Sequence, residues 1–362
     1  MGALPAIAAR AEVIRHHRLQ GGQVAAVLPV HAPRALLRAY GFLPVDVWGP
    51  PGVRTSDGAS HLQPYVCSIV RNALSFLLSG GLDSTDLILV PHACDSLQGL
   101  GSILLDFVKP RQPVVPLYYP RSDGVGAHRF LAEEFRRLAT RMGEITSRAP
   151  AADEILQYVV DEETGDRLLL ELHEARRQLP LTNADFYRLV RSREYLPREA
   201  FETAARQALA MRHPDSAPGK TLLLSGVVPE PTSLMAALDE RQVLIVADDT
   251  LCGRRRVCPP GRSRDPFERL AQSWLDGPPD STRGSSMAAR SDYLVRQVAA
   301  SGARGVVFSL VKFCEPELFY LPTLRKALQR KGVPSVVLEV DLNDALSLQI
   351  ITRLDALLEM IP

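Results

Sequence analysis

The sequence predicts an α/β protein with two Rossmann-like domains, each built on a mainly parallel four-stranded sheet, joined by a helical segment. Short apolar runs alternate with amphipathic stretches at both ends of the chain, whereas the middle shows helical periodicity with almost no strand pattern. A chain of 362 residues also exceeds the size of one ordinary core. We therefore divide it into an N-terminal α/β domain at 1–125, a helical bridge at 126–217 and a C-terminal α/β domain at 218–362.

The first domain opens as a βαβ unit and continues with the same alternation. Apolar runs of strand length end at turn formers such as Pro91, and longer stretches repeat their apolar residues at helical spacing. The strands are expected at 23–30, 43–48, 85–90 and 113–118, and the helices at 33–40, 61–78 and 96–108. This pattern is typical of a parallel sheet with crossover helices.

The bridge and the second domain follow from the same criteria. Four amphipathic helices are expected at 129–143, 153–178, 183–193 and 198–212, and a Pro- and Gly-containing linker at 213–219. Four further strands are expected at 221–227, 242–247, 305–309 and 334–340. The Ser-, Gly- and Arg-rich stretch 280–290 is the candidate for a mobile loop. Two similar domains, related by duplication, follow from this repeat.

Composition excludes several classes of function. The net charge is +1 without long runs of like charge, so no nucleic-acid partner is indicated. The first residues lack a secretory signal pattern, and no apolar stretch reaches the length of a membrane span. We therefore expect a cytoplasmic protein whose five cysteines are reduced thiols. They would serve metal binding, catalysis or packing.

Two of the cysteines occupy equivalent places in the two domains. Cys94 and Cys314 each follow the third strand of their domain, stand next to an acidic residue and precede a helix, while Cys67 lies near the start of a helix. Ligands of open α/β sheets bind at the carboxyl ends of the strands, where a helix N-terminus favours a thiolate. The three spacings match no compact zinc or ferredoxin motif, so packing of small buried thiols is the competing interpretation.

A glycine-rich hexapeptide suggests a different chemistry. The sequence Ser-Gly-Gly-Leu-Asp-Ser, from Ser79 to Ser84, matches the signature with which ATP pyrophosphatases bind pyrophosphate. That use needs a strand before the glycines and a helix after them, but here a helical pattern precedes them and a strand follows. We interpret Gly80 and Gly81 as a helix C-terminus and keep an adenylating enzyme as the alternative. No Walker A or dinucleotide motif occurs.

Four short blocks resemble the 2-hydroxyacyl-CoA dehydratase and benzoyl-CoA reductase family. They are Cys-Ser-Ile-Val-Arg at 67–71, Pro-His-Ala-Cys-Asp-Ser at 91–96, Asp-Asp-Thr-Leu-Cys-Gly-Arg at 248–254 and Lys-Phe-Cys-Glu-Pro at 312–316. The stretch 320–358 is also similar, so the resemblance covers most of the chain. The resemblance implies an enzyme subunit with a [4Fe-4S] cluster held by Cys67, Cys94 and Cys314. It would pass single low-potential electrons to a CoA thioester, giving a ketyl-type radical for dehydration (a lyase) or aromatic ring reduction (an oxidoreductase).

The resemblance also implies partners: a homologous second subunit in a heterodimer, and a separate ATP-hydrolysing activator that donates the electron. These enzymes are anaerobic. Neither the acyl-CoA nor the choice between dehydration and reduction follows from the sequence, and a noncatalytic partner subunit is a further alternative.

Other residues near the cysteines are assigned from their positions. His92 is the candidate catalytic residue, able to hydrogen-bond a cluster sulfur or a substrate oxygen, although it suits a turn-capping role equally well. We expect Arg71 either to face a cleft between the two domains or to pair with an acid. Arg254 is a candidate ligand of the CoA phosphates, unless the run of three arginines at 254–256 is only a solvated loop. We interpret Cys252 as a packing or supporting thiol and Cys258 as incidental.

Overall fold

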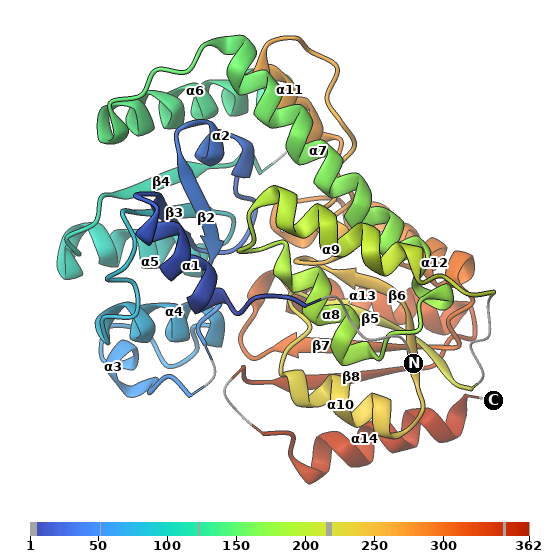
Figure 1. The fold of residues 1–362 in the computed structure, drawn as a ribbon. Coiled ribbons are helices and arrows are strands. Elements are labelled where there is room, and N and C mark those ends of the chain that lie inside the picture. Colours follow the sequence, from blue (N-terminus) through green and yellow to red (C-terminus); the bar gives the residue numbers. More distant parts are fainter. Residues whose placement is uncertain (1–5, 51, 122–123, 215–218, 343–344, 362) are drawn as a thin grey trace.

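The computed structural model describes residues 6–50, 52–121, 124–214, 219–342 and 345–361. Figure 1 shows two separate four-stranded sheets, one in each half of the chain, with helices around both. Every strand pairing in both sheets is parallel. The predicted α/β class with two Rossmann-like, four-stranded domains is therefore confirmed.

The two sheets have the same topology. The first has the order β2-β1-β3-β4 and the second the order β6-β5-β7-β8, so the second strand of each half lies at one edge. The strands of the first sheet are β1 (Gln23–Val27), β2 (Phe42–Asp46), β3 (Leu87–His92) and β4 (Val114–Tyr118). Those of the second are β5 (Thr221–Gly226), β6 (Leu244–Thr250), β7 (Gly305–Val311) and β8 (Ser335–Val340). In both halves the chain order reverses between the first and third strands, where open sheets bind ligands.

The helices of the first half surround its sheet. They are α1 (Arg10–Leu19), α2 (Arg34–Ala39), the short α3 (Ser56–Ala59), α4 (Ser68–Leu78), α5 (Asp95–Ile103) and a π-helical turn at Leu104–Val108. The expected helix at 61–78 begins only at Ser68. On one face of the sheet, Ile88 and Val90 of β3 pack against α4 and α5. On the other face, Leu87 and Leu89 of β3 pack in a second core, which includes α6. Both faces are buried, as a parallel sheet requires.

The middle of the chain is helical, as expected. It contains α6 (Ala127–Thr146), α7 (Ala152–Glu174), a 3₁₀ turn at Arg176–Gln178, α8 (Asn183–Ser192) and α9 (Arg198–Ala210). In Figure 1 the long α7 runs from the side of the first sheet to α9, which packs beside the second sheet. Side chains of α8 and α9 share one apolar core with β5, and α6 shares another with β3. The middle helices therefore contribute to the cores of both sheets, α6 to that of the first sheet and α8 and α9 to that of the second.

In the second half of the chain, the segment between β6 and α12 extends to the first half and packs there; this segment is called the excursion. Its helices are α10 (Thr232–Glu240), a 3₁₀ turn at Arg254–Arg256, α11 (Pro266–Leu275), a 3₁₀ turn at Ser281–Arg283, α12 (Met287–Ser301), α13 (Glu315–Arg330) and α14 (Leu348–Met360). Helix α11 packs against α6, and Trp274 on α11 joins the core of the first sheet. The excursion between β6 and α12 thus ties the two halves together. Among the described residues, no helix has the length and apolar character needed to cross a membrane.

Candidate functional site

The three predicted cysteines occupy the same structural position on three different helices. Cys67 is the N-cap residue of α4, Cys94 that of α5 and Cys314 that of α13. The first-turn amides of a helix have no partner within it, and they carry the positive end of its dipole. These amides lower the pKa of the sulfur they face, those of Ile69 and Val70 for Cys67, of Ser96 and Leu97 for Cys94, and of Glu317 for Cys314. None of the three side chains makes a capping hydrogen bond.

The three thiols lie in one apolar cluster and influence one another electrostatically. Cys67 and Cys314 are each 7% exposed, and Cys94 packs against the same cluster, which also contains Val311 and Leu342. Burial, followed by the neighbouring Cys67 thiol, raises the pKa of Cys94 to about 12. Burial and the charges of Cys67 and Glu317 raise the pKa of Cys314, and burial raises that of Cys67. The cysteines of the two halves therefore share a site between the sheets.

The site is expected to hold a four-iron cluster. Across the described ranges, no group of three His, Cys, Asp or Glu side chains is placed to hold a metal ion. Thiols on three helix ends in an apolar surrounding match the donor type of such a cluster, which is held by cysteine thiolates.

His92 ends β3 with its ring turned toward α5. A Cβ atom at Gly101, almost two turns along α5 from Cys94, would lie 2.8 Å from its Nε2, and the Tyr118 ring lies edge-on with centroids 4.5 Å apart. Both ring nitrogens are buried without a hydrogen-bond partner, and desolvation lowers the pKa of His92. The ring is therefore a neutral group packed between α5 and β4, and its catalytic role stays a prediction.

Arg71 pairs with an acid across the two halves of the chain. Its Nη2 lies 2.8 Å from Oδ2 of Asp341, which follows β8, and both side chains are largely buried. Its positive charge also lowers the pKa of the nearby Cys67 thiol. The expectation of an acidic partner is confirmed, and the pair joins α4 to the C-terminal sheet beside the cysteines.

The three consecutive arginines have three different environments. Arg254 lies 4.0 Å from Glu174 and Arg256 lies 3.7 Å from Asp46, both at partly accessible places. Arg255 has no exposed side-chain surface and bonds Asp280 at 2.7 Å and Glu317 at 3.1 Å. The solvated-loop interpretation is therefore wrong for Arg255, because its charge is satisfied inside the protein. Phosphate binding by Arg254 stays a prediction.

The expected mobile loop at 280–290 is instead buried where it begins. Asp280 is 0% exposed, and Ser281, Thr282 and Arg283 are nearly as buried. Asp280 caps the 3₁₀ turn and pairs with Arg255, and Ser281 donates to Glu317 at 2.7 Å. Polar composition indicated a loop, but these side chains are polar because they complete a buried ionic network. Residues 343–344, inside the stretch of family resemblance, lie outside the described residues.

Glu317 is a residue near the site that the sequence did not single out. It stands in the first turn of α13, three residues after Cys314, and its charge raises the pKa of that thiol. An acid in a first turn is ordinary for a helix, so only its burial at 3% exposed reveals a special role. It connects Cys314 to Arg255 and Ser281.

The two remaining cysteines are not N-cap residues of these helices. Cys252 belongs to the same apolar cluster as the three thiols but lies beside Thr250, and burial raises its pKa. Cys258 has its sulfur 3.1 Å from Nη2 of Arg283 and, like Cys252, lines a small cavity. The packing interpretation of Cys252 fits its surroundings, whereas the Arg283 contact gives Cys258 a defined partner.

The glycine-rich hexapeptide lies at the end of a helix. Ser79 is the C-cap of α4 and Gly80 has φ +81°, while the amides of Gly80 and Gly81 donate to the carbonyls of Leu77 and Phe76. These amides are used by the helix itself and do not face an anion. The predicted helix stop is confirmed.

A large cavity opens between the two halves, and none of the three cysteines is among its lining residues. Its volume is about 1130 Å³, and its lining includes Trp48 and Leu342, which belong to the same apolar cluster as the three thiols. Helix α1 and the segment that begins α10 form other walls, and the charged lining residues include arginines at positions 10, 15, 18 and 191 together with Asp46 and Glu230. Arg10, Arg18 and Arg191 form ion pairs with carboxylates. The cavity thus combines a large apolar surface with charges of both signs.

Fold and site together define a two-sheet α/β protein with three cysteines gathered between the sheets. A family model described as 2-hydroxyglutaryl-CoA dehydratase, D-component, matches residues 29–361, and the chain belongs to this family. The resemblance found in the sequence is therefore confirmed.

Three relatives show which proteins the chain is similar to. It is 24% identical to the beta subunit of lactoyl-CoA dehydratase of Anaerotignum propionicum, over 92% of this chain and 91% of that one. It is 24% identical to the beta subunit of (R)-2-hydroxyglutaryl-CoA dehydratase of Acidaminococcus fermentans (91% and 90%). It is 26% identical to a benzoyl-CoA reductase subunit of Thauera aromatica (87% and 84%). These relatives are subunits of lyases and of an oxidoreductase that act on CoA thioesters.

Proposed function

We propose that the chain is the iron–sulfur subunit of a 2-hydroxyacyl-CoA dehydratase or a benzoyl-CoA reductase-type enzyme. Cys67, Cys94 and Cys314 would hold a [4Fe-4S] cluster. The observation that carries this proposal is that these three cysteines, distant in sequence, all occupy N-cap positions of helices around one apolar cluster. When bound, the cluster would supply single low-potential electrons for radical dehydration or ring reduction of an acyl-CoA.

The protein's own contribution is electrostatic and steric. Three helix N-termini stabilise the negative charge of three thiolates, and the apolar surroundings exclude water. Arg71 adds a positive charge one turn from Cys67 and fixes α4 to Asp341 of the other half. The Arg255–Glu317 contact holds the first turn of α13, and hence Cys314, in place.

The large cavity is the place for a CoA thioester. Its volume of about 1130 Å³ slightly exceeds the usual range of small-molecule sites, which suits a long acyl and pantetheine chain. Arg15, the lining arginine that forms no ion pair among the described residues, suits the anionic end of such a ligand. A homologous second subunit and a separate ATP-dependent activator complete the proposed enzyme, and roles for His92 and Arg254 toward substrate belong to the same proposal.

Anaerobic reconstitution with iron and sulfide tests the cluster. We expect about four irons and four sulfides per chain, with charge-transfer absorption and an electron paramagnetic resonance signal after reduction. Replacing Cys67, Cys94 or Cys314 with Ser should lower bound iron, whereas Cys258→Ser should leave it unchanged. A colourless protein without iron after reconstitution contradicts the proposal.

The alternatives give different results in the same preparations. A cluster-bound protein that shows no turnover with partner subunit, activator and substrate would be a noncatalytic partner subunit. ATP binding lost on Gly81→Val, without iron, would favour the adenylating enzyme. The amide bonding at Gly80 and Gly81 argues against that second result.

A further inference from the structure

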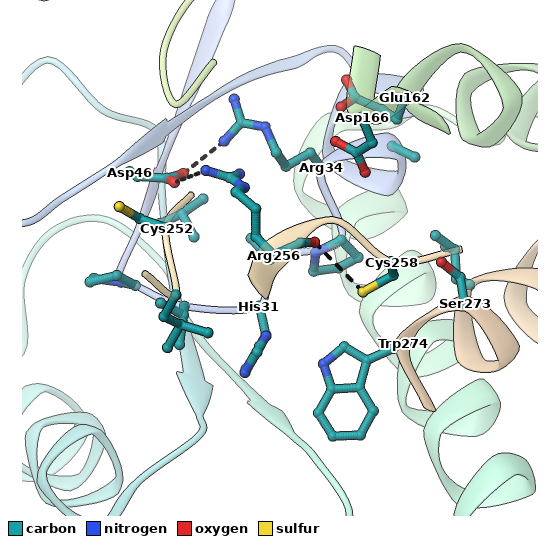
Figure 2. A pocket seen from close by; sticks show the side chains of 18 of the residues that line it. His31, Arg34, Asp46, Glu162, Asp166, Cys252, Arg256, Cys258, Ser273 and Trp274 are labelled. Atoms are coloured by element: carbon teal, nitrogen blue, oxygen red, sulfur yellow. Dashed lines mark hydrogen bonds and ion pairs between the residues drawn. The ribbon is translucent and has the colours of Figure 1, made fainter. Parts of the chain in front are cut away.

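A small cavity with several charged side chains in its walls lies between the first sheet, α7 and the segment between β6 and α12, which includes α11 (Figure 2). Its volume is about 130 Å³, which is room for a few water molecules or one small ion. It begins at the carboxyl end of β1, at the point where the strand order of the first sheet reverses. Open α/β sheets bind ligands at this place. Nothing in the proposed cluster chemistry uses it.

The unpartnered polar side-chain atoms of the described lining residues are mostly donors. The one acceptor among them, Oε1 of Glu162, forms an ion pair with Arg38. Four buried N–H groups of lining residues have no hydrogen-bond partner: Nε of Arg34, Nε1 of Trp48, Nε1 of Trp274 and Nε of Arg283. Each of these side chains belongs to a residue less than 9% exposed. A buried donor without an acceptor costs roughly 1–3 kcal/mol, so four of them favour a ligand that brings acceptors.

The charges around the cavity are unequal. Asp46 is shared by Arg34 at 2.7 Å and Arg256 at 3.7 Å, as the dashed lines in Figure 2 show. On the other side, Glu162 and Asp166 both pair with Arg193, and Glu162 also pairs with Arg38. Four guanidinium groups thus already meet three carboxylates before Arg283 is considered.

Arg283 adds a positive charge, and its guanidinium donates hydrogen bonds to uncharged groups. Its Nη1 donates to the Pro278 carbonyl at 3.0 Å and its Nη2 to the Cys258 sulfur at 3.1 Å, and its guanidinium lies over the Trp274 ring. No ion pair among the described residues joins it to a carboxylate, and Asp280, whose pKa its charge helps to lower, already pairs with Arg255. A buried guanidinium normally has an anionic partner.

We propose that this cavity binds a small oxyanion, with inorganic phosphate as the probe. Arg283, Arg34 and the two indole N–H groups would donate to its oxygen atoms. Guanidinium groups match the geometry of phosphate oxygens, and an oxyanion would satisfy both the unpaired donors and the excess positive charge. A cation is disfavoured, since all three carboxylates of the walls are already engaged by arginines.

The chain contains a built-in reporter for this site. Its only two tryptophans, Trp48 and Trp274, both line the cavity. Titration with phosphate, balanced with chloride at constant ionic strength, should give a saturable change in tryptophan fluorescence. Arg283→Gln should raise the half-saturating concentration by about tenfold or more, because a hydrogen bond to a charged group is lost. The exposed Arg141 provides the matched control, and Arg141→Gln should bind as the native chain does.

A second variant protects the test against misfolding. Trp274→Phe keeps an aromatic ring beneath Arg283 but removes one unpaired donor, so phosphate should bind severalfold more weakly, reported by Trp48. The absence of a saturable signal in the native chain overturns the proposal. Phosphate binding as tight as that of the native chain by both folded variants, Arg283→Gln and Trp274→Phe, overturns it as well.

Discussion

Replacement of Arg255 with Met should destabilise the protein far more than the same replacement of its neighbour Arg254. Arg255 is completely buried, and its guanidinium forms ion pairs with three carboxylates, at 2.7 Å from Asp280, 3.1 Å from Glu317 and 3.9 Å from Asp249. It also donates to the Gly226 carbonyl at the end of β5. Met approximates the length of the side chain but leaves these acids buried without this partner.

The expected cost follows from the loss of one partner of a buried ion pair. Such losses typically cost about 3–5 kcal/mol because an uncompensated charge stays inside the protein. An unfolding entropy of about 2.1 cal/mol/K per residue gives roughly 0.8 kcal/mol/K for 362 residues. Dividing the lost free energy of unfolding by this entropy gives a fall in melting temperature of about 5 °C. Differential scanning calorimetry of the metal-free chain measures this shift directly.

Arg254 provides the matched control, because it stands in the same 3₁₀ turn. Its contact with Glu174 is at 4.0 Å and partly exposed, so Arg254→Met should cost less than about 1 kcal/mol. The reasoning fails if the two variants melt at the same temperature. A double variant that also carries Glu317→Leu should lose less than the two single losses together, since the two residues interact directly.

Three other predictions test separate parts of the structure. Burial lowers the pKa of His173 from 6.5 to about 4, so the unfolded chain gains a proton first as the pH falls through this window. Stability should therefore drop by up to about 3 kcal/mol between roughly pH 6.5 and 4, and urea unfolding of His173→Leu should show a flatter profile. Arg71→Leu should lower stability by about 1–3 kcal/mol and increase protease cleavage between the halves, because it breaks the 2.8 Å contact with Asp341; unchanged cleavage would argue against this. Gly226→Ala should abolish soluble folded protein, because a Cβ there would lie 2.2 Å from the Ser309 carbonyl oxygen in the adjacent strand; a native-like circular dichroism spectrum would contradict this.

The sequence determined the strands and the position of the thiols through local signals. Short apolar runs ending at turns located all eight strands, and the order strand, cysteine, acid, helix placed Cys94 and Cys314 at equivalent ends. Cys67 could be placed near a helix start by periodicity, although the N-cap position required the structure. Alternation of strands and helices is a property of neighbouring residues, so it can be read without knowledge of the fold.

Long-range features had no comparable signal. Nothing in residues 254–256 distinguishes the buried Arg255 from its two neighbours, because burial depends on Asp280 and Glu317, which lie far along the chain. The return of α11 to the first sheet is equally nonlocal, since its amphipathic pattern does not say which core it joins. The ionic network and the small cavity therefore emerge only when the two halves are packed together.

The duplicated fold suggests why the site offers three thiols. In the first half, Cys67 is the N-cap residue of the helix before the third strand (α4), and Cys94 is that of the helix after it (α5). In the second half, Cys314 is the N-cap residue of the helix after the third strand (α13). The N-cap residue of the helix before that strand (α12) is Ser286, whose hydroxyl accepts a hydrogen bond from the Ala289 amide. Two similar halves thus present four corresponding helix ends and only three thiols. Under the proposed function, one iron of a four-iron cluster would lack a protein thiolate, as an open coordination site for a substrate oxygen requires.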